Sequence, residues 1–306
     1  MTTYKSNLIE QNRIITFPET EGFESNFPDN YYSADEQIVS PELSQLVFES
    51  LPINFGSKIR EIREMMTDSV DYCVIKNLPI DKMSAEDFRL FVIGFSTLFG
   101  EPTKTDKKLG KVAWPIKPDP SATGSNLTFS QHNGEAELHT DTQYFDKPEN
   151  IATLYCVNPD KNYGGVNSFV NIRHVERNMR STEDGETSWK VLGDTLFPFR
   201  VPTVFTESTN DKEIEIVYKP IVSPEIPVRY RKDTIQNAIR TGRATITNEQ
   251  SSALEQFEKA LNNPDLALSS FLNRGDALFV NNHTIFHART SFEDYNRFLY
   301  RVRINN

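Results

Sequence analysis

The sequence predicts a mainly β domain with helices packed at its periphery, an α+β arrangement. Many short segments with β character are separated by proline, glycine, asparagine and aspartate, a pattern typical of a sandwich or barrel. Neither a regular alternation of strands and helices nor a glycine-rich phosphate loop occurs, so a dinucleotide-binding sheet is not expected. The predicted strands cover residues 151–157, 167–172, 200–205, 213–219, 277–281 and 297–304.

Two helical stretches are predicted ahead of these strands. The apolar spacing is helical from 41 to 68, and Ser40-Pro41-Glu42 is a helix-start signal. A strand is predicted at 70–76. A second helix is predicted at 84–98, because its first residue is a serine that can cap it and a glycine follows shortly after its end. Residues 101–135 are rich in loop-forming residues.

We expect one domain over residues 41–306, preceded by an extended arm over residues 1–40. A chain of 306 residues is long enough to bury a sizeable core. Residues 175–270 separate the motifs described below and include a stretch with helical spacing at 233–262. We expect this insert to cover the site as a lid and to determine most of the substrate specificity.

The composition is that of an ordinary globular protein and excludes several classes of function. A formal charge of −10 argues against a nucleic-acid surface, which would carry clustered lysine and arginine. No apolar run approaches the roughly 20 residues that span a bilayer, and the first residues lack the pattern of a signal peptide. Cys73 and Cys156 lie in apolar runs and indicate buried thiols in a reducing compartment. We therefore expect a cytoplasmic protein that acts on a small molecule and that binds neither nucleic acid nor a membrane.

A metal site would have to use the five histidines of the chain together with carboxylates, because the cysteines are not paired at ligand spacing. His139 and Asp141 form an H-x-D triplet, and on a strand the side chains of residues i and i+2 point to the same side. His174 and Glu176 form a similar triplet. The residues around this second triplet predict the start of an exposed helix, in which positions i and i+2 diverge by about 200°. The first triplet is therefore the better candidate.

The other candidate ligand is His287, near the C-terminus. An apolar strand at 277–281 runs into a polar turn and then reaches His287. Its rival is His283, whose polar neighbours favour a position in the turn itself. Two histidines and one carboxylate on one face of an octahedral iron leave three coordination positions open for a cosubstrate and oxygen.

The C-terminal strand carries arginines on one face. Strand alternation places Arg297, Arg301 and Arg303 on the same side as Leu299, with aromatic and aliphatic residues on the other side. If the arginine face looks into a barrel mouth, Arg297 can clamp a dicarboxylate by a bidentate pair of hydrogen bonds. Alternatively, this is an edge strand whose arginines lie in solvent and protect against edge-to-edge aggregation. The strand taken alone leaves both possibilities open.

Together these motifs resemble the TauD/TfdA, clavaminate-synthase-like branch of the Fe(II)- and 2-oxoglutarate-dependent oxygenases. The resemblance covers roughly residues 60–304. It depends on four motifs in the order of the family, which are ELHTD at 137–141, GGVNS at 164–168, NHTIFHARTSF at 282–292 and RFLYR at 297–301. The resemblance implies a double-stranded β-helix (jelly-roll) core with iron at its open end.

The resemblance also implies a role for each matching residue. The implied ligands of Fe(II) are His139, Asp141 and His287. Arg297 matches the arginine that holds the distal carboxylate of the cosubstrate 2-oxoglutarate, and Arg301 matches a second arginine that touches the substrate in some members. Ser168 lies where the family usually has threonine or serine beside the first arginine. The GGVNS motif is one residue longer than the common form, so Asn167 is the alternative to Ser168.

The implied reaction uses O2 to hydroxylate an unactivated C–H bond, although relatives also desaturate or cyclise. Asp141 argues against halogenation, because halogenating members have glycine or alanine at that position. Four polar residues before the first ligand, Ser130, Gln131, Asn133 and Glu137, are candidates for the substrate pocket. A pocket with both Glu137 and Arg301 suits a zwitterion, so a free or tethered amino acid is the expected substrate. A sulfonate or simple carboxylate that uses Arg301 alone is the alternative.

Two other classes of function use similar residues. Two histidines and a carboxylate also bind zinc for hydrolysis, but a hydrolase leaves the GGVNS motif and Arg297 unexplained. A non-enzymatic, cupin-like binding module is the other alternative, and it predicts that substitution of Asp141 hardly affects function. Oxygen-dependent formation of succinate distinguishes all three classes.

Overall fold

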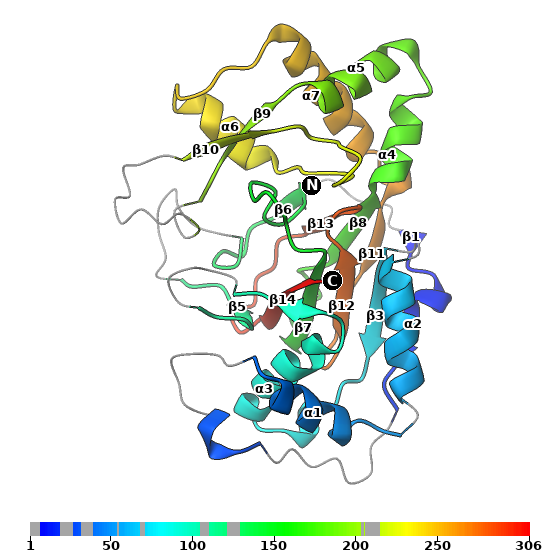
Figure 1. The fold of residues 1–306 in the computed structure, drawn as a ribbon, viewed down its shortest axis with the longest axis vertical. Coiled ribbons are helices and arrows are strands. Elements are labelled where there is room, and N and C mark those ends of the chain that lie inside the picture. The colour runs from blue at the N-terminus through cyan, green and yellow to red at the C-terminus, as the bar shows by residue number, and fades with distance from the viewer. Residues whose placement is uncertain are drawn as a thin grey trace.

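The computed structural model describes residues 7–18, 27–31, 39–53, 55–67, 71–104, 110–120, 129–202, 205 and 215–306. In this part of the chain two large sheets lie in the middle of an elongated molecule, with α1 and α3 at one end and α5, α6 and α7 at the other (Figure 1). The helices are α1 (Pro41–Ser50), α2 (Phe55–Thr67), α3 (Ala85–Thr97), α4 (Ile172–Met179), α5 (Glu183–Asp194), α6 (Lys232–Arg240) and α7 (Asn248–Leu261). The predicted α+β class is thereby confirmed.

The chain passes repeatedly from one sheet to the other. The first sheet has the order β1-β11-β8-β13-β6, formed by Asn7–Leu8, Leu268–Ser270, Asn167–Asn171, Ile285–Arg289 and Ala136–His139. The second has the order β2-β3-β12-β7-β14-β4, formed by Ile14–Thr16, Tyr72–Lys76, Ala277–Asn281, Ile151–Asn158, Phe298–Asn305 and Glu101–Pro102. Strand β5 (Trp114–Ile116) pairs with β14. The segments β6, β7 and β8, and again β12, β13 and β14, alternate between the two sheets.

Strands of the second sheet are buried on both faces. On the face toward the first sheet, Leu278 and Leu299 belong to an apolar cluster between the two sheets. On the opposite face, Phe279, Val302 and Ile304 pack with residues of α1, α2 and α3. Burial on both faces accounts for the continuous apolar runs in these strands. The alternation predicted for the C-terminal strand is confirmed, so its arginine face looks into the space between the sheets.

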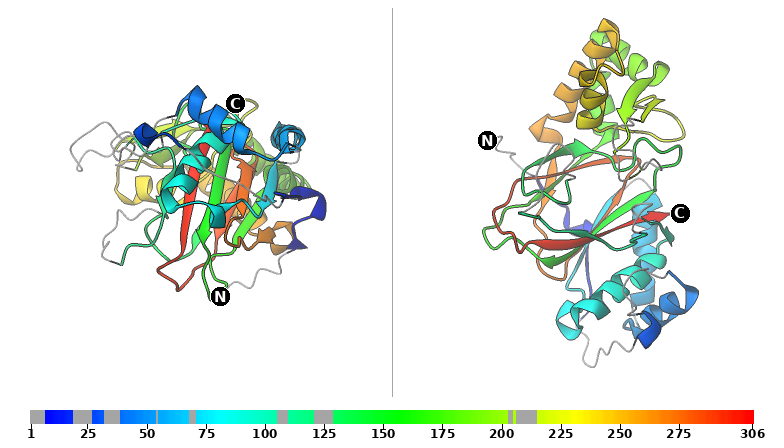
Figure 2. Two further views of the ribbon diagram at one scale, coloured as in Figure 1. Left: turned by 90° about the horizontal axis from the view of Figure 1, so that it is seen from below. Right: turned by 90° about the vertical axis from the view of Figure 1, so that its left-hand side faces the viewer.

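The helices at the other end of the molecule form a core of their own with the outer face of the first sheet. Helices α4 to α7 pack with the two-stranded sheet of β9 (Phe197–Arg200) and β10 (Ile216–Lys219). The rings of Phe257 in α7 and Phe286 in β13 lie 5.8 Å apart, which joins this core to the sheet. The right-hand view of Figure 2 shows these helices gathered at one end of the molecule, beyond the sheets. Among the described residues, no helix combines the length and apolar character needed to cross a membrane.

Two stretches predicted as single helices are each two helices. The stretch at 41–68 is interrupted after α1, where Pro52 has no N–H to donate and restricts the backbone of the residue before it. The stretch at 233–262 is interrupted between α6 and α7, where Gly242 has a φ of 66° that favours glycine and ends a helix.

The strand predicted at 200–205 lies earlier in the chain. Strand β9 pairs antiparallel with β10 and ends at Arg200, and Pro202 cannot donate to a strand ladder. Residues 203–204 of this predicted strand, and residues 213–214 of the strand predicted at 213–219, lie outside the described residues. Of the arm predicted at 1–40, the described part includes β1 and β2, which pair in parallel with β11 and β3.

The close approach of α1 and α3 generates a prediction about stability. A Cβ at Gly94 would lie 2.5 Å from Cγ2 of Val47 and 2.9 Å from the backbone oxygen of Leu43. Because a backbone atom cannot move aside cheaply, we expect Gly94→Ala to lower the free energy of unfolding by about 1–3 kcal/mol. Urea denaturation followed by circular dichroism measures this change.

The matched control is Gly56→Ala in α2. A Cβ at Gly56 meets nothing within 4 Å, so we expect no loss of stability there. Equal destabilisation by the two substitutions would show that the contact between α1 and α3 is not the cause.

Candidate metal centre

His139 and His287 lie opposite each other on neighbouring strands. Strand β13 pairs antiparallel with β6, and the register places His287 across from His139. The two imidazole centroids are 4.3 Å apart. His283 lies in the turn between β12 and β13, where its Nε2 is 2.9 Å from the carbonyl oxygen of Pro148. The structure therefore groups His287, and not His283, with His139.

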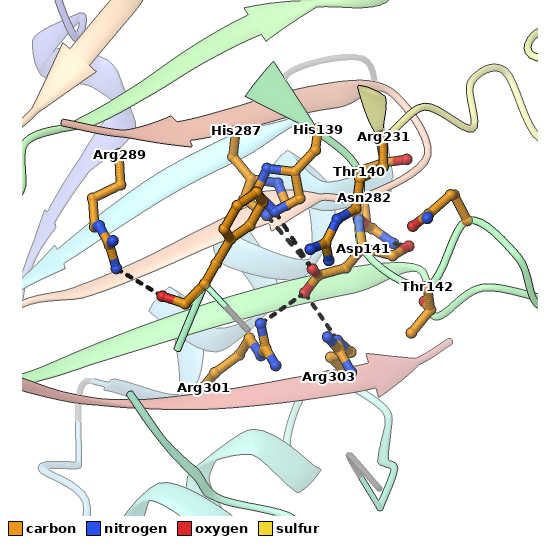
Figure 3. A network of polar contacts seen from close by, with 12 residues as sticks. His139, Thr140, Asp141, Thr142, Arg231, Asn282, His287, Arg289, Arg301 and Arg303 are labelled. Atoms are coloured by element: carbon orange, nitrogen blue, oxygen red, sulfur yellow. Dashed lines mark hydrogen bonds and ion pairs between the residues drawn. The ribbon is translucent and has the colours of Figure 1, made fainter. Parts of the chain in front are cut away.

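Asp141 joins the two histidines from a turn. Strand β6 ends at His139, so the strand alternation expected for the H-x-D triplet does not extend to Asp141. Its Oδ1 is nevertheless 3.7 Å from Nε2 of His139 and 3.9 Å from Nε2 of His287 (Figure 3). One ligand atom from each of the three residues lies within 4.8 Å of the others, which is a spacing that one metal ion can bridge.

Asn282 fixes the backbone of Asp141. The buried side chain of Asn282 accepts a hydrogen bond from the Asp141 N–H at 2.7 Å through Oδ1. Its Nδ2 donates to the carbonyl oxygens of Asp141 and Glu149, each at 3.0 Å. The turn that contains Asn282 is thus hydrogen-bonded to the turn that contains Asp141. This contact links the chain segment of His287 to the segment of His139 and Asp141.

The protonation states of this group suit a divalent metal ion. Nδ1 of His139 is 2.7 Å from the carbonyl oxygen of Glu137, which accepts its hydrogen and leaves the lone pair on Nε2. Burial lowers the pKa of His139 well below the ordinary value and also lowers the pKa of His287. Two neutral imidazoles and one carboxylate are the donor set that open iron sites use.

The two oxygens of Asp141 have different neighbours. Oδ1 faces the imidazoles, whereas Oδ2 is 2.9 Å from Nε of Arg303 and 3.6 Å from Nη1 of Arg301. Burial alone would raise the pKa of the Asp141 carboxyl, but Arg303 and Arg301 outweigh it and hold this pKa well below its usual range. The carboxylate is therefore ionised at neutral pH.

A cavity opens beside the three residues, lined by strands of both sheets. Its polar lining comprises Ser130, Asn167, Arg289, Arg297 and Arg301 together with the candidate ligands. Nη1 of Arg297 and Nδ2 of Asn167 are buried, and neither has a hydrogen-bond partner among the described residues. Buried donors without a partner are costly, so these atoms indicate a place for an anionic acceptor.

Gly165 makes room for Arg297. Its φ is 68°, a conformation that favours glycine, and a Cβ there would lie 2.5 Å from Nε of Arg297. Its carbonyl oxygen is 3.3 Å from Nη2 of Arg297. The GGVNS motif therefore shapes the pocket around this guanidinium. The first two residues of β8 take different positions, because Asn167 lines the cavity and Ser168 does not.

Arg289 holds the loop that covers one side of the cavity. Its guanidinium donates to the carbonyl oxygens of Phe129 and His132 at 3.0 Å and of Gly134 at 2.5 Å. The Phe129 ring lies 5.0 Å from the ring of His139. The loop therefore places an aromatic side chain against one of the candidate ligands.

Of the four polar residues predicted to line the substrate pocket, Ser130 lines the cavity and the other three do not. Glu137 is exposed on β6, and Gln131 and Asn133 are half-buried without lining the cavity. Their backbone carbonyls instead accept hydrogen bonds from Asp119 and Phe292. His174 is exposed on α4, as the sequence predicts.

Sequence reasoning assigned no role to Asn282, Arg289 or Arg303. Signals were nevertheless present, since Arg303 shares the strand face of Arg297 and Arg301, and Asn282 and Arg289 belong to the motif at 282–292. Asn282 and Arg289 act through a turn and a loop, whose contacts no periodic pattern predicts.

The chain matches the family described as taurine catabolism dioxygenase TauD, TfdA family over residues 49–303. It is also 26% identical over 168 residues to Dioxygenase str8 from Strobilurus tenacellus. That match covers 51% of this chain and 35% of the fungal protein, so it spans about a third of that protein's length.

Solved structures resemble the whole fold. An asparagine oxygenase in complex with Fe(II), (2S,3S)-3-hydroxyasparagine and succinate matches with a TM-score of 0.69 at 13% identity, over 96% of this chain and 93% of its own. The non-heme iron oxygenase OrfP, in complex with Fe and α-ketoglutaric acid, matches with a TM-score of 0.61 at 16% identity, over 86% and 83% of the two chains. At these identities the likeness concerns the fold.

The cluster generates a prediction about metal binding. We expect His139→Ala to weaken binding of Co(II) to metal-free protein at least about 100-fold, because even partners of ligands contribute 10- to 100-fold. Isothermal titration calorimetry measures the affinity. His174→Ala is the control, since it removes the exposed histidine of the other triplet and should leave the affinity unchanged. Similar losses in both variants would place the metal elsewhere.

Proposed function

The chain belongs to the taurine catabolism dioxygenase TauD, TfdA family. From this premise we propose that it is an Fe(II)- and 2-oxoglutarate-dependent oxygenase that hydroxylates a free or tethered amino acid. The observation that carries the proposal is that a candidate metal site lies beside a candidate anion site. His139, Asp141 and His287 converge at a cavity in which Arg297 has a buried donor with no partner among the described residues. A metal site beside an anion site is what iron with a dicarboxylate cosubstrate requires.

The topology supports a double-stranded β-helix core. In such a core successive strands alternate between two sheets, and here β6, β7 and β8 do so, as do β12, β13 and β14. We propose that residues 41–306 form one domain with this core, that residues 1–40 form an arm, and that 175–270 is an insert that covers the site. The separate apolar core of α4 to α7 supports the last assignment.

His139, Asp141 and His287 would hold Fe(II) through two nitrogen atoms and one oxygen. Iron(II) and 2-oxoglutarate, when bound, supply the power to oxidise a C–H bond with O2 while 2-oxoglutarate becomes succinate and carbon dioxide. The protein keeps both imidazoles neutral by burial and keeps the Asp141 carboxylate ionised through Arg303 and Arg301. All three side chains are therefore ready to bind a cation at neutral pH.

Arg297 and Asn167 would bind the distal carboxylate of 2-oxoglutarate. A carboxylate offers acceptors for both the Arg297 guanidinium and the Asn167 amide, and it would satisfy two buried donors at once. Asn167 suits this role better than Ser168, because only the former lines the cavity. The asparagine would then replace the threonine or serine that the sequence resemblance led us to expect.

Arg301 would hold the carboxylate of the substrate. It lines the cavity close to Asp141, and its buried Nε has no partner among the described residues. The asparagine oxygenase and OrfP structures contain 3-hydroxyasparagine and 3-hydroxyarginine, which supports an amino acid here. Glu137, Gln131 and Asn133 lie outside the lining, so we do not extend the proposal to them.

A sulfonate or simple carboxylate is a second candidate substrate. Asp141 is the sole carboxylate of the cavity lining among the described residues, and its two oxygens face the histidines and the arginines. No lining group there is free to pair with a substrate ammonium. Measuring the rate of succinate formation with each amino acid and with its 2-hydroxy analogue decides between the two substrate classes.

We expect purified protein supplied with Fe(II), 2-oxoglutarate and a panel of amino acids to form succinate only when O2 is present. Mass spectrometry with labelled O2 should detect one added oxygen atom in the product. Asp141→Ala should abolish both signals, because it removes an anionic ligand. Succinate-free conversion, or hydrolysis that depends on Zn(II), would contradict the proposal and favour the hydrolase.

Substitutions of Asn167 and Ser168 test the cosubstrate site. We expect Asn167→Ala to raise the KM for 2-oxoglutarate by about 10- to 100-fold, because a hydrogen bond to a charged group contributes about 1.5–3 kcal/mol. Ser168→Ala on the same strand should change it by less than about 2-fold. Arg297→Met serves as the positive comparator and should raise the KM at least as much as Asn167→Ala. A larger effect of Ser168→Ala than of Asn167→Ala would reverse the assignment.

A further inference from the structure

Arg303 lies on the side of Asp141 that faces away from the imidazoles. Its Nε donates to Oδ2 of Asp141 at 2.9 Å, and the residues are 3% and 2% exposed. Oδ1 of the same carboxylate is 3.7 and 3.9 Å from the histidine nitrogens. Each oxygen of Asp141 is thus committed to a different set of neighbours (Figure 3).

Such a bond limits how the carboxylate can bind a metal. A free aspartate can rotate about its last carbon–carbon bond and offer one oxygen or both. A charge-assisted hydrogen bond to one oxygen, which is about twice as strong as a neutral one, opposes that rotation. Burial strengthens the bond further, because water does not compete for either partner.

Arg303 is itself held firmly in place. It lies within β14, where it pairs with Ala152 of β7. Its carbonyl oxygen accepts a hydrogen bond from the Thr103 N–H at 2.9 Å. Glu149, buried and bonded to Thr142 and Thr103 through its two oxygens, adds a second negative charge that acts on the guanidinium. A rigid strand therefore carries the donor.

We propose that Arg303 is a positioning residue, which holds Oδ2 of Asp141 so that Oδ1 alone is presented to the metal. The inference rests on the metal site of the proposed function. Binding through a single oxygen keeps the coordination positions for cosubstrate and O2 open. Arg301 differs, because it is 3.6 Å from the same oxygen and lines the cavity, where its Nε has no hydrogen-bond partner in the described part of the chain.

The alternative is that Arg303 acts through its charge alone, by offsetting the buried carboxylate. Glutamine and methionine separate the two explanations. Glutamine places its amide nitrogen at the same distance along the side chain as Nε of arginine, so Arg303→Gln keeps the donor and loses the charge. Arg303→Met places a methyl group there and loses both.

The experiment measures Co(II) affinity of metal-free protein by calorimetry. If Arg303 positions Asp141, Arg303→Met weakens the affinity about 10- to 100-fold, the usual range for partners of metal ligands, whereas Arg303→Gln stays within about 3-fold of the parent. If only charge matters, both variants bind Co(II) equally well or more tightly, because a cation near the metal has been removed. That second result would overturn the inference.

A spectroscopic measurement gives an independent readout. Infrared difference spectra on metal binding, recorded with carbon-13 aspartate, report the splitting between the two carboxylate stretches, which narrows when both oxygens bind. We expect a narrower splitting in Arg303→Met than in Arg303→Gln and the parent. Equal splitting in all three proteins would count against the inference.

Two controls keep the outcomes distinct. Arg274→Met removes an arginine that lies outside the cavity lining, where it pairs with Asp81, and should leave Co(II) affinity unchanged. Thermal melting of the metal-free variants shows whether they fold. A loss of Co(II) affinity in Arg303→Met but not in Arg303→Gln supports the positioning role. The proposed metal site itself is wrong if the parent protein fails to bind Co(II). It is also wrong if His139→Ala binds Co(II) as well as the parent does.

Discussion

The pairing of β13 with β6 is the constraint on which the site depends. Its register sets His287 opposite His139, and side chains alternate along a strand, so a slip of one residue would turn one imidazole out of the site. The turn that leads into β13 brings Asn282 to the backbone of Asp141. One strand pairing therefore gathers three candidate ligands from two distant segments of the chain.

Electrostatics then decide how the cavity can be used. Arg289, Arg297 and Arg301 line the cavity, whereas among the described residues Asp141 is the sole carboxylate of its lining and contacts Arg301 and Arg303. Burial lowers the pKa of Arg297 and of Arg301 to about 10. Cations removed from water are unfavourable unless anions accompany them. A dicarboxylate cosubstrate and an anionic substrate group would supply the missing negative charge, which links the family membership to the physics of the cavity.

The two outer cores give this cavity its rigidity. Helices α1 to α3 cover the outer face of one sheet, and α4 to α7 cover the outer face of the other. The outer face of each sheet is thereby packed against helices. The space between the sheets can then hold polar groups that a single apolar core would exclude. Arg289 adds a local restraint, since it ties the loop of Phe129 to the floor of the same space.

Local patterns in the sequence were sufficient to predict β3, β7, β8, β12 and β14 and the alternation of the C-terminal arginines. These features depend on neighbours along the chain, so periodicity and spacing reveal them. Only the tertiary structure showed that Asp141 lies in a turn, that Asn167 and not Ser168 lines the cavity, that Glu137 is exposed, and that Arg303 reaches Oδ2 of Asp141. Each of these depends on strand register and on turn geometry, which are set by contacts between segments more than a hundred residues apart and leave no local pattern.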